Sequence, residues 1–174
     1  VVPLDGHPVT VELGSGTGML ARCLADELGP ATLLDSSPAM VDVASKALVA
    51  EGLGDWSAAV ADLSEGVPGG PYELALAQMF LHHVDDVPAL LTKLHRAMTP
   101  GGVVVIADLD HDAAKRYHAT AVDFHGHHGF CRGELRGWLE AGYRDICFHD
   151  AGVVGKEVDG ERQDFPMFLA VAKA

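Results

Sequence analysis

The sequence has little positive charge and few aromatic residues, and each shortage argues against a class of protein. Twelve lysines and arginines stand against 25 aspartates and glutamates, and the net charge is −13. No basic cluster is present to neutralise a phosphate backbone, so unaided binding to nucleic acid is disfavoured. Aromatic residues make up 6% of the chain, which leaves no stripe of rings on which bases would stack.

Cysteine usage and hydropathy indicate where the protein works. Cys23, Cys131 and Cys147 are odd in number and have no paired spacing, so we expect reduced thiols and a cytoplasmic location. No apolar run approaches the length of a membrane span, and the N-terminus lacks the features of a secretion signal. With 174 residues and 48% hydrophobic content, the chain is expected to form a single domain, residues 1–174, with no membrane partner.

A glycine-rich motif near the start carries most of the functional information. Residues 11–19 read Val-Glu-Leu-Gly-Ser-Gly-Thr-Gly-Met, an apolar run with one acid followed by three glycines at alternate positions. Gly14, Gly16 and Gly18 allow the backbone to turn sharply and approach a ligand, and the helical pattern that follows offers unpaired N–H groups. The motif predicts a nucleotide cradle, and a plain tight turn is the alternative.

The glycines alone leave two cofactors open. Residues 16–21 fit the pattern G-x-G-x-x-A, which is typical of dinucleotide-dependent dehydrogenases. Glu12 argues against that interpretation, because its carboxylate would repel a pyrophosphate but attract the ammonium group of an aminoacyl ligand. Residues 78–83 also lack an obvious hydride-transfer Tyr/Lys pair. An NAD(P)-dependent oxidoreductase is therefore the weaker hypothesis.

Short β-rich runs alternate with helical patterns along the chain. Strands are expected at 9–13, 31–34, 57–61, 72–78, 103–107, 145–149 and 167–172, and helices at 19–28, 38–50, 85–98 and 132–141. The last two strands are separated by a polar turn region and no helix, so they must pair antiparallel. The alternation predicts a doubly wound α/β fold: a mostly parallel seven-stranded sheet with an antiparallel C-terminal hairpin and helices on both faces.

Ten histidines are present, and several gather in two places. His82 and His83 follow the fourth expected strand, and His125, His127 and His128 lie in the polar stretch 108–130, at the sheet edge where ligands bind in this fold. This second group, with Asp123, matches no ordered zinc pattern, so no metal is predicted. The first group fits a loop pair in which one histidine orients the next helix, whereas the family resemblance given below implies that His83 lines the pocket.

The order of the motifs resembles that of the class I S-adenosylmethionine-dependent methyltransferases over nearly the whole chain. The likeness is closest to the small-molecule branch that contains the quinone-biosynthesis type enzymes, and that family's antiparallel seventh strand agrees with the expected hairpin. The motifs that carry it are Val-Glu-Leu-Gly-Ser-Gly-Thr-Gly at 11–18, Leu-Leu-Asp-Ser-Ser-Pro-Ala-Met at 33–40, Ala-Asp-Leu at 61–63, Leu-Ala-Gln-Met-Phe-Leu-His-His at 76–83, Thr-Pro-Gly-Gly at 99–102 and the tail segments 128–130, 139–143 and 165–169.

The resemblance implies that residues at several strand ends bind S-adenosylmethionine. Glu12 would reach toward the ammonium group through water, Asp35 would accept from the ribose hydroxyls, and Met40 would cover the adenine. Asp62 would accept from the adenine amine, and Gln78 would lie near the sulfonium. Taken singly, Asp35 also fits a helix cap, Asp62 a turn and Met40 the core. The expected set is Glu12, Gly14, Ser15, Gly16, Thr17, Gly18, Asp35, Ser36, Met40, Ala61, Asp62, Leu63 and Gln78.

Methyl transfer from a sulfonium mainly needs alignment and exclusion of water, and it yields S-adenosylhomocysteine. An acceptor that carries a proton also needs a base, for which His83, His127 and His128 are the candidates. The acceptor is expected to be a small molecule. The lid helices usual before the first strand in this family are almost absent, so residues 108–130, a missing segment or a partner, including a second copy, would close the site. A cofactor-binding module or a partner-dependent subunit without its own turnover is the alternative.

Overall fold

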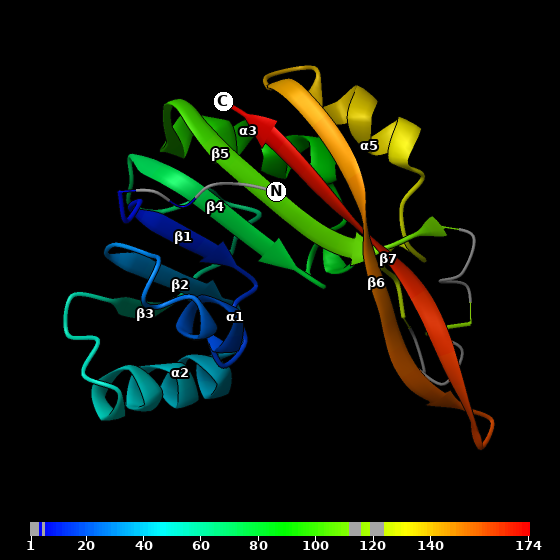
Figure 1. Cartoon of the computed structure of the whole chain (residues 1–174), viewed down its shortest axis with the longest axis horizontal. Coiled ribbons are helices and arrows are strands. Elements are labelled where there is room, and N and C mark those ends of the chain that lie inside the picture. Colours follow the sequence, from blue (N-terminus) through cyan, green and yellow to red (C-terminus); the bar gives the residue numbers. More distant parts are fainter. Residues whose placement is uncertain (1–3, 5, 112–115, 119–123) are drawn as a thin grey trace.

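The strands form one mixed sheet in the computed structural model, which describes residues 4, 6–111, 116–118 and 124–174. Within these ranges, seven strands lie in the order β3-β2-β1-β4-β5-β7-β6 (Figure 1). The strands β1 to β5 pair in parallel, whereas β7 is antiparallel to both β5 and β6, which confirms the predicted fold class. The strands are β1 (Thr10–Leu13), β2 (Ala31–Asp35), β3 (Ser57–Val60), β4 (Tyr72–Gln78), β5 (Met98–Leu109), β6 (Arg144–Val158) and β7 (Glu161–Lys173).

The two best-defined helix starts have side-chain caps. Ser37 precedes α2, and its hydroxyl accepts a hydrogen bond from the Met40 N–H at 3.4 Å. Asp86 precedes α3, and its carboxylate accepts from the Ala89 N–H at 2.9 Å. The helices of the described ranges are α1 (Met19–Cys23), α2 (Pro38–Ala50), the short 3-10 helix η1 (Leu81–His83), α3 (Val87–Ala97) and α5 (Arg132–Leu139).

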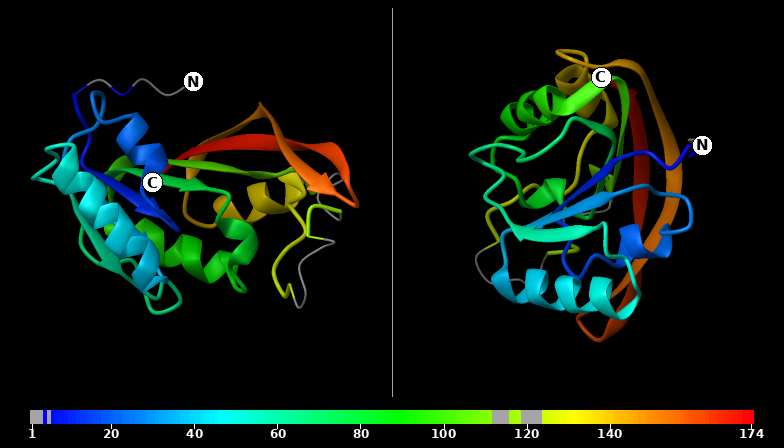
Figure 2. Two further views of the ribbon diagram at one scale, coloured as in Figure 1. Left: turned by 90° about the horizontal axis from the view of Figure 1, so that it is seen from below. Right: turned by 90° about the vertical axis from the view of Figure 1, so that its left-hand side faces the viewer.

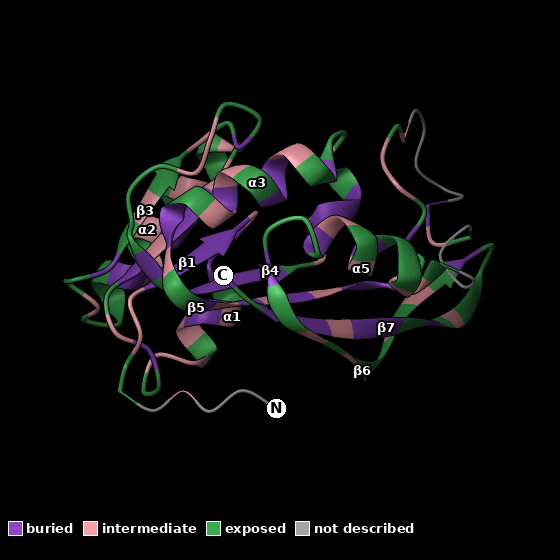
Figure 3. Ribbon diagram, turned by 90° about the horizontal axis from the view of Figure 1, so that it is seen from above, coloured by how far each residue is buried: buried purple, intermediate pink, exposed green. Residues whose placement is uncertain are grey.

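The sheet separates two apolar layers. Consecutive residues such as Leu33 and Leu34 of β2 enter different layers, because side chains alternate across a strand. Figures 2 and 3 show α3 and α5 on one side of the sheet, α1 on the other, and mainly buried strands between them. One layer includes Ala21 of α1 and Leu33, Ala44, Leu48 and Leu76. The other includes Leu34, Leu90 and Leu94 of α3, and Leu135 and Leu139 of α5.

The strand order reverses its direction between β1 and β4. From β1 the sheet continues through β2 to β3, and on the other side β4 is followed by β5. In doubly wound sheets, the loops at the carboxyl ends diverge at such a reversal and leave a crevice in which ligands bind. The glycine loop, residues 14–18, follows β1, and residues 79–83 follow β4, so both motifs lie at this crevice.

The C-terminal hairpin is longer than the sequence predicts. The strands β6 and β7 remain paired out to Val158↔Glu161, and Figure 1 shows the pair extending beyond the rest of the sheet. Asp159 and Gly160, with φ angles of 55° and 80°, form the connection, as suits a two-residue hairpin turn. The Asp-Gly pair could have revealed this turn. The strands on either side of the turn were not predicted, because most side chains of β6 are exposed and the sequence there shows no apolar alternation.

The outer half of the hairpin forms a wall beside the end of β5. Its inner side belongs to a third apolar cluster, in which Val158 and Phe165 are buried against Leu109. Tyr117 packs on this cluster, and the Lys156 ammonium donates a hydrogen bond to the Tyr117 carbonyl oxygen at 2.5 Å. The hairpin therefore supports part of the segment that connects β5 to α5.

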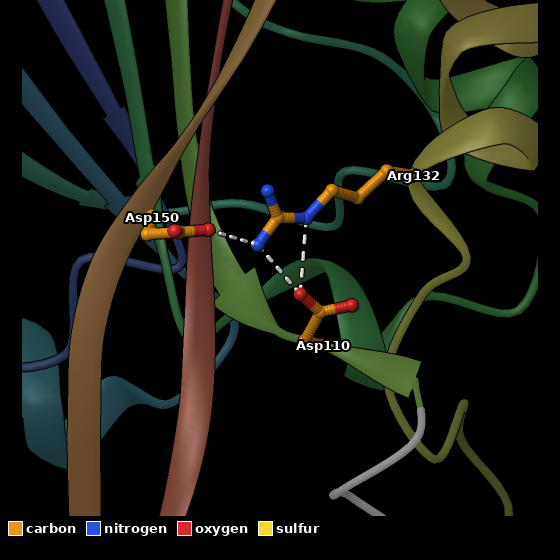
Figure 4. Close-up of polar contacts among 3 residues, drawn as sticks. All are labelled: Asp110, Arg132 and Asp150. Carbon is orange, nitrogen blue, oxygen red and sulfur yellow. Dashed lines mark hydrogen bonds and ion pairs between the residues drawn. The ribbon is translucent and has the colours of Figure 1, made fainter.

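An arginine ties the two ends of that segment to the hairpin (Figure 4). Arg132, at the start of α5, donates from Nε and Nη2 to Asp110 at 3.0 and 2.7 Å, and from Nη2 to Asp150 of β6 at 2.7 Å. The Phe130 N–H donates to the Leu109 carbonyl oxygen at 3.0 Å, which closes the base of the connection. Three regions that are distant in sequence thus meet at one guanidinium.

The first helix is shorter than expected. The pattern predicts a helix over 19–28, but α1 ends at Cys23 and the chain continues in turns, with the Leu24 N–H donating to the Ala21 carbonyl oxygen at 2.9 Å. The Gly29 N–H donates to the Pro8 carbonyl oxygen at 3.1 Å. The chain must leave the helix early to make this contact and to enter β2 in register with β1.

Candidate functional site

The glycine loop has the backbone that only glycine adopts easily. Gly14, Gly16 and Gly18 have φ angles of 60°, 54° and 72°. A Cβ atom on Gly14 would overlap the ring of Phe80, the second residue after β4, so the absence of a side chain there lets the two loops meet. A Cβ atom on Gly16 would meet no atom within 4 Å, so this part of the loop borders open space.

Asp35 fixes the shape of the glycine loop. Its Oδ2 accepts a hydrogen bond from the Gly16 N–H at 2.7 Å, and its Oδ1 accepts from the Ser37 N–H at 2.8 Å. The Ser15 N–H donates to the Leu34 carbonyl oxygen at 3.0 Å. One carboxylate therefore links the loop after β1 to the start of α2, and its half-buried position leaves it accessible from the crevice.

Glu12 lies beneath the loop. Its side chain is 4% exposed, and Oε2 accepts a hydrogen bond from the Ala21 N–H of α1 at 3.3 Å. Burial raises the pKa of Glu12 to about 7, and the negative charge of Asp35 acts in the same direction, while the Ala21 hydrogen bond acts against them. A cation placed near this carboxylate would lower the pKa again.

A cleft of about 770 Å³ opens at the crevice between these loops. That volume lies within the range typical of small-molecule sites. Eight of the residues predicted to bind the cofactor line it, and they come from the loop after β1, from the end of β2 and the start of α2, and from the loop after β3, which sequence spacing alone does not bring together. They are Gly14, Gly16, Asp35, Ser36, Met40, Ala61, Asp62 and Leu63.

Five predicted residues lie outside the lining. Glu12, Ser15 and Gly18 are buried, and the Ser15 hydroxyl has no hydrogen-bond partner among the described residues. Thr17 is half-buried, and Gln78 is exposed at the end of β4. Some motif residues therefore form the surface of the crevice, and others lie outside that surface.

Asp62 also serves the turn that follows it. Its Oδ1 accepts from the Ser64 N–H at 2.9 Å, and this hydrogen bonding lowers the pKa of the Asp62 carboxyl. The alternative interpretation of Asp62 as a turn residue is therefore correct for one of its two carboxylate oxygens. Because Asp62 is exposed in the cleft as well, the turn and a ligand contact are compatible.

Several lining residues escaped sequence reasoning. Met79, directly after β4, has a φ of 50°, a strained conformation for a residue with a side chain, and its N–H donates to the Ala107 carbonyl oxygen at 2.8 Å. One face of α3 also borders the cleft. Its members repeat at helical spacing after an Asp cap, which is the signal that would have found them: Asp86, Ala89, Leu90 and Lys93.

The predicted histidines separate in space. His83 lines the cleft, and partial desolvation lowers the pKa of its imidazole. The His127 ring lies near Phe130 and Trp138, with centroid distances of 5.1 and 6.3 Å, and is absent from the cleft lining. The exposed His128 lies 5.8 Å, centroid to centroid, from the ring of His118.

His82, which sequence reasoning left as a loop residue, is the most constrained histidine of the site. It is 2% exposed, and its Nδ1 lies 2.7 Å from Oδ1 of Asp108, which is fully buried at the end of β5. Asp108 also accepts from the Leu109 N–H at 2.8 Å. The parallel strands β4 and β5 end at the same sheet edge, which brings these two side chains together.

The fold and the position of the cleft define the class of protein: a Rossmann-like α/β domain with a ligand site at the reversal of strand order. The family described as "Methyltransferase domain" matches residues 4–147. The chain belongs to this family, the class I S-adenosylmethionine-dependent methyltransferases, and the family prediction is confirmed. The match also decides between the two cofactors that the glycine pattern left open.

Individual relatives agree with the family. The biotin biosynthesis bifunctional protein BioCD of Bordetella avium is 33% identical over 120 residues, which are 66% of this chain and 24% of that protein. The trans-aconitate 2-methyltransferase of Azoarcus sp. is 34% identical over 107 residues, 60% of this chain and 40% of that protein. This chain therefore spans less than half the length of either relative.

A solved structure shows the same fold. Phosphoethanolamine N-methyltransferase 2 of Haemonchus contortus, in complex with S-adenosyl-L-methionine, matches with a TM-score of 0.76 at 18% identity, over 96% of this chain and 48% of that one. In the described part of this chain, no helix is long and apolar enough to cross a membrane. Across residues 4, 6–111, 116–118 and 124–174, no three His, Cys, Asp or Glu side chains are placed to hold a metal ion; Asp123 lies outside these ranges.

Proposed function

We propose that this chain binds S-adenosylmethionine in the cleft and transfers its methyl group to a small-molecule acceptor. The observation that carries the proposal is the convergence of motif residues from three strand ends on one cleft, beside a glycine loop that leaves backbone open to a ligand. When bound, the cofactor supplies an electrophilic methyl group on a positively charged sulfur. The chain's own residues bind and orient it.

The residues of the cleft match the chemical groups of the cofactor. Asp35 has unused lone pairs with which to accept from ribose hydroxyls, although each oxygen already accepts one backbone hydrogen bond. Met40, 44% exposed, and Leu63 offer apolar surface for adenine, and Asp62 offers a carboxylate for its amine. Glu12 sits beneath the loop, where a nearby ammonium group would favour its charged form.

A small-molecule acceptor, rather than a nucleic acid, fits the charge of the chain. The net charge of −13 disfavours nucleic acid, and the Azoarcus relative is named for methylating trans-aconitate. The cytoplasm is the proposed location, since Cys23, Cys131 and Cys147 are free and exposed.

Calorimetric titration of the purified chain with S-adenosylmethionine, S-adenosylhomocysteine and NADH tests the cofactor. We expect adenosyl binding that weakens about ten- to a hundredfold in Asp35→Ala, the loss expected for charge-assisted hydrogen bonds. Gly16→Val should lose binding by filling the open side of the loop. Asp26→Ala, an exposed site away from the cleft, and Gly52→Val, another glycine with positive φ and open space, are the matched controls.

The same titrations test whether Glu12 lies close to the ammonium group of the bound cofactor. At about pH 6.5, much of Glu12 is protonated, so binding of an ammonium group should release part of a proton, seen as a binding enthalpy that depends on the buffer. Glu12→Gln should abolish that dependence. Binding of NADH alone, or of no adenosyl compound, would overturn the proposed function.

A further inference from the structure

A lysine of α3 borders the cleft. Lys93 lines it together with Asp86, Ala89 and Leu90 of the same helix face. The residue is half-buried, although lysine side chains usually extend into solvent. Its ammonium donates a hydrogen bond to the carbonyl oxygen of Ser64, which lies 29 residues earlier in the chain. The helix is therefore joined to the loop after β3 at the border of the cleft.

The loop after β3 is a tight turn that carries Asp62. The Ser64 N–H donates to Oδ1 of Asp62 at 2.9 Å, and the Glu65 N–H donates to the Asp62 carbonyl oxygen at 3.1 Å. Leu63 is 9% exposed and belongs to the apolar layer that contains α3. These hydrogen bonds fix the shape of the turn from within, and the bond from Lys93 ties the turn to the helix.

Lys93 also acts on the charge of Asp62. Hydrogen bonding from Ser64 lowers the pKa of the Asp62 carboxyl, and the positive charge of Lys93 acts in the same direction. The carboxylate is therefore ionised near pH 7 and can only accept hydrogen bonds. An ionised carboxylate has about four acceptor positions, so the turn leaves room for a bond from a ligand. An N–H donor on the ligand is favoured at this place, and a carbonyl oxygen is repelled.

Two other roles for Lys93 fit the contacts less well. A lysine that bound an anionic ligand directly would have its ammonium free, whereas this one is engaged with Ser64, and the nearby cleft lining includes Asp62 and Asp86, which would repel an anion. A lysine that only covered apolar surface would extend its ammonium into water. The contact with a backbone oxygen in the turn that carries Asp62 favours a role through that turn.

We propose that Lys93 sets the preference of the cleft for adenine by holding the loop after β3 so that the Asp62 carboxylate meets the amino group of the base. This inference rests on the proposed function, because it takes the adenine of S-adenosylmethionine to lie beside Asp62. Adenine donates hydrogen bonds from its amino group, whereas hypoxanthine has a carbonyl oxygen at the same position. A fixed carboxylate accepts from the first and repels the second. Lys93 is a positioning residue, since it acts through Ser64 and Asp62.

Calorimetric titration with S-adenosylhomocysteine and S-inosylhomocysteine tests this preference. The two ligands share their ribose and amino-acid parts and differ in the base, which is adenine in the first and hypoxanthine in the second. The native chain should bind the adenosyl ligand about ten- to a hundredfold more tightly. In Lys93→Met, which keeps the apolar length of the side chain, affinity for the adenosyl ligand should fall about three- to tenfold. Affinity for the inosyl ligand should change by less than about twofold, because its base gives Asp62 no amino hydrogen.

Two further variants serve as rescue and control. Lys93→Arg keeps the positive charge and the N–H donors, so it should recover most of the affinity for the adenosyl ligand. Lys46→Met removes an exposed lysine of α2 that pairs with Asp42, and it should bind both ligands as the native chain does.

A double-mutant cycle separates positioning of Asp62 from general support of the fold. In an Asp62→Ala background, Lys93→Met should change adenosyl affinity by less than about twofold, because the carboxylate that Lys93 positions is gone. Equal losses for both ligands, an equal loss with and without Asp62, or native-like affinities in Lys93→Met would overturn the inference and leave the proposed function intact. A native chain that binds no adenosyl ligand would overturn both.

Discussion

The crevice has two sides that are held together by different kinds of contact. On the glycine-loop side, the loops after β1 and β2 meet through backbone N–H groups, as between Gly16 and Asp35 at 2.7 Å and between Ser15 and Leu34 at 3.0 Å. On the other side, which we call the His82 side, the loops after β4 and β5 and the hairpin meet through ionisable side chains, as between His82 and Asp108 at 2.7 Å, in addition to backbone hydrogen bonds such as that from the His127 N–H to the His82 carbonyl oxygen.

The difference explains what each side can tolerate. The glycine-loop side depends on backbone N–H groups held at positive φ and on the Asp35 carboxylate that accepts from them, so it accepts few changes at its glycines or at Asp35. Contacts between side chains from distant segments depend on particular pairs, so the His82 side changes with single substitutions of those pairs.

The largest effect should come from a side chain on the glycine loop. Gly14→Ala introduces strain at a φ of 60° and overlap with Phe80, and we expect the free energy of unfolding to fall by about 3 kcal/mol in urea. Gly52→Ala has the same kind of strain without an overlap and should cost about 1 kcal/mol. Equal losses in both variants would show that the contact between the loops after β1 and β4 contributes nothing.

The pH dependence of stability should distinguish the buried acid of the glycine-loop side. The pKa of Glu12 is raised from 4.5 to about 7 by folding, so its proton stabilises the folded chain below about pH 4.5, and this stabilisation is lost as the pH rises through 7. The shift corresponds to about 3 kcal/mol as an upper figure. Urea unfolding across this range should show the fall in the native chain and a much flatter profile in Glu12→Gln. Exposed Glu27→Gln is the control, and a native-like fall in Glu12→Gln would contradict the assignment.

A smaller effect, confined to the His82 side, should follow from removing the arginine of Figure 4. Arg132→Ala breaks the contacts with Asp110 and Asp150 at a partly exposed position, so we expect a loss of about 1–2 kcal/mol. Hydrogen exchange should become faster at the Phe130 amide and stay unchanged at the Ser15 amide. Arg162→Ala, which removes an exposed ion pair on β7, should change stability by less than about 0.5 kcal/mol. Faster exchange at Ser15 in Arg132→Ala would break the distinction between the two sides.

Sequence reasoning succeeded where one local signal acts within a short segment. The helical pattern predicted a helix at 38–50, where the structure has α2, and the glycine spacing predicted a loop whose φ angles the structure shows. It failed for the outer hairpin, because exposed strands lack the apolar alternation that marks a buried one. It also left His82 as a loop residue, since its partner lies 26 residues away on another strand.

The amino-acid sequence by itself determined the alternation of strands and helices, the glycine loop, the methyltransferase family and, among the residues that line the cleft, eight of the predicted cofactor-binding residues together with His83. These follow from periodicity, backbone preference and motif order, all of which are local properties of the chain. Only the tertiary structure decided that Glu12 is buried beneath the loop, that Phe80 closes against Gly14 and that Asp108 holds His82. Burial and pairing arise when parallel strands place their carboxyl ends at one edge, and no single segment encodes which side chains meet there.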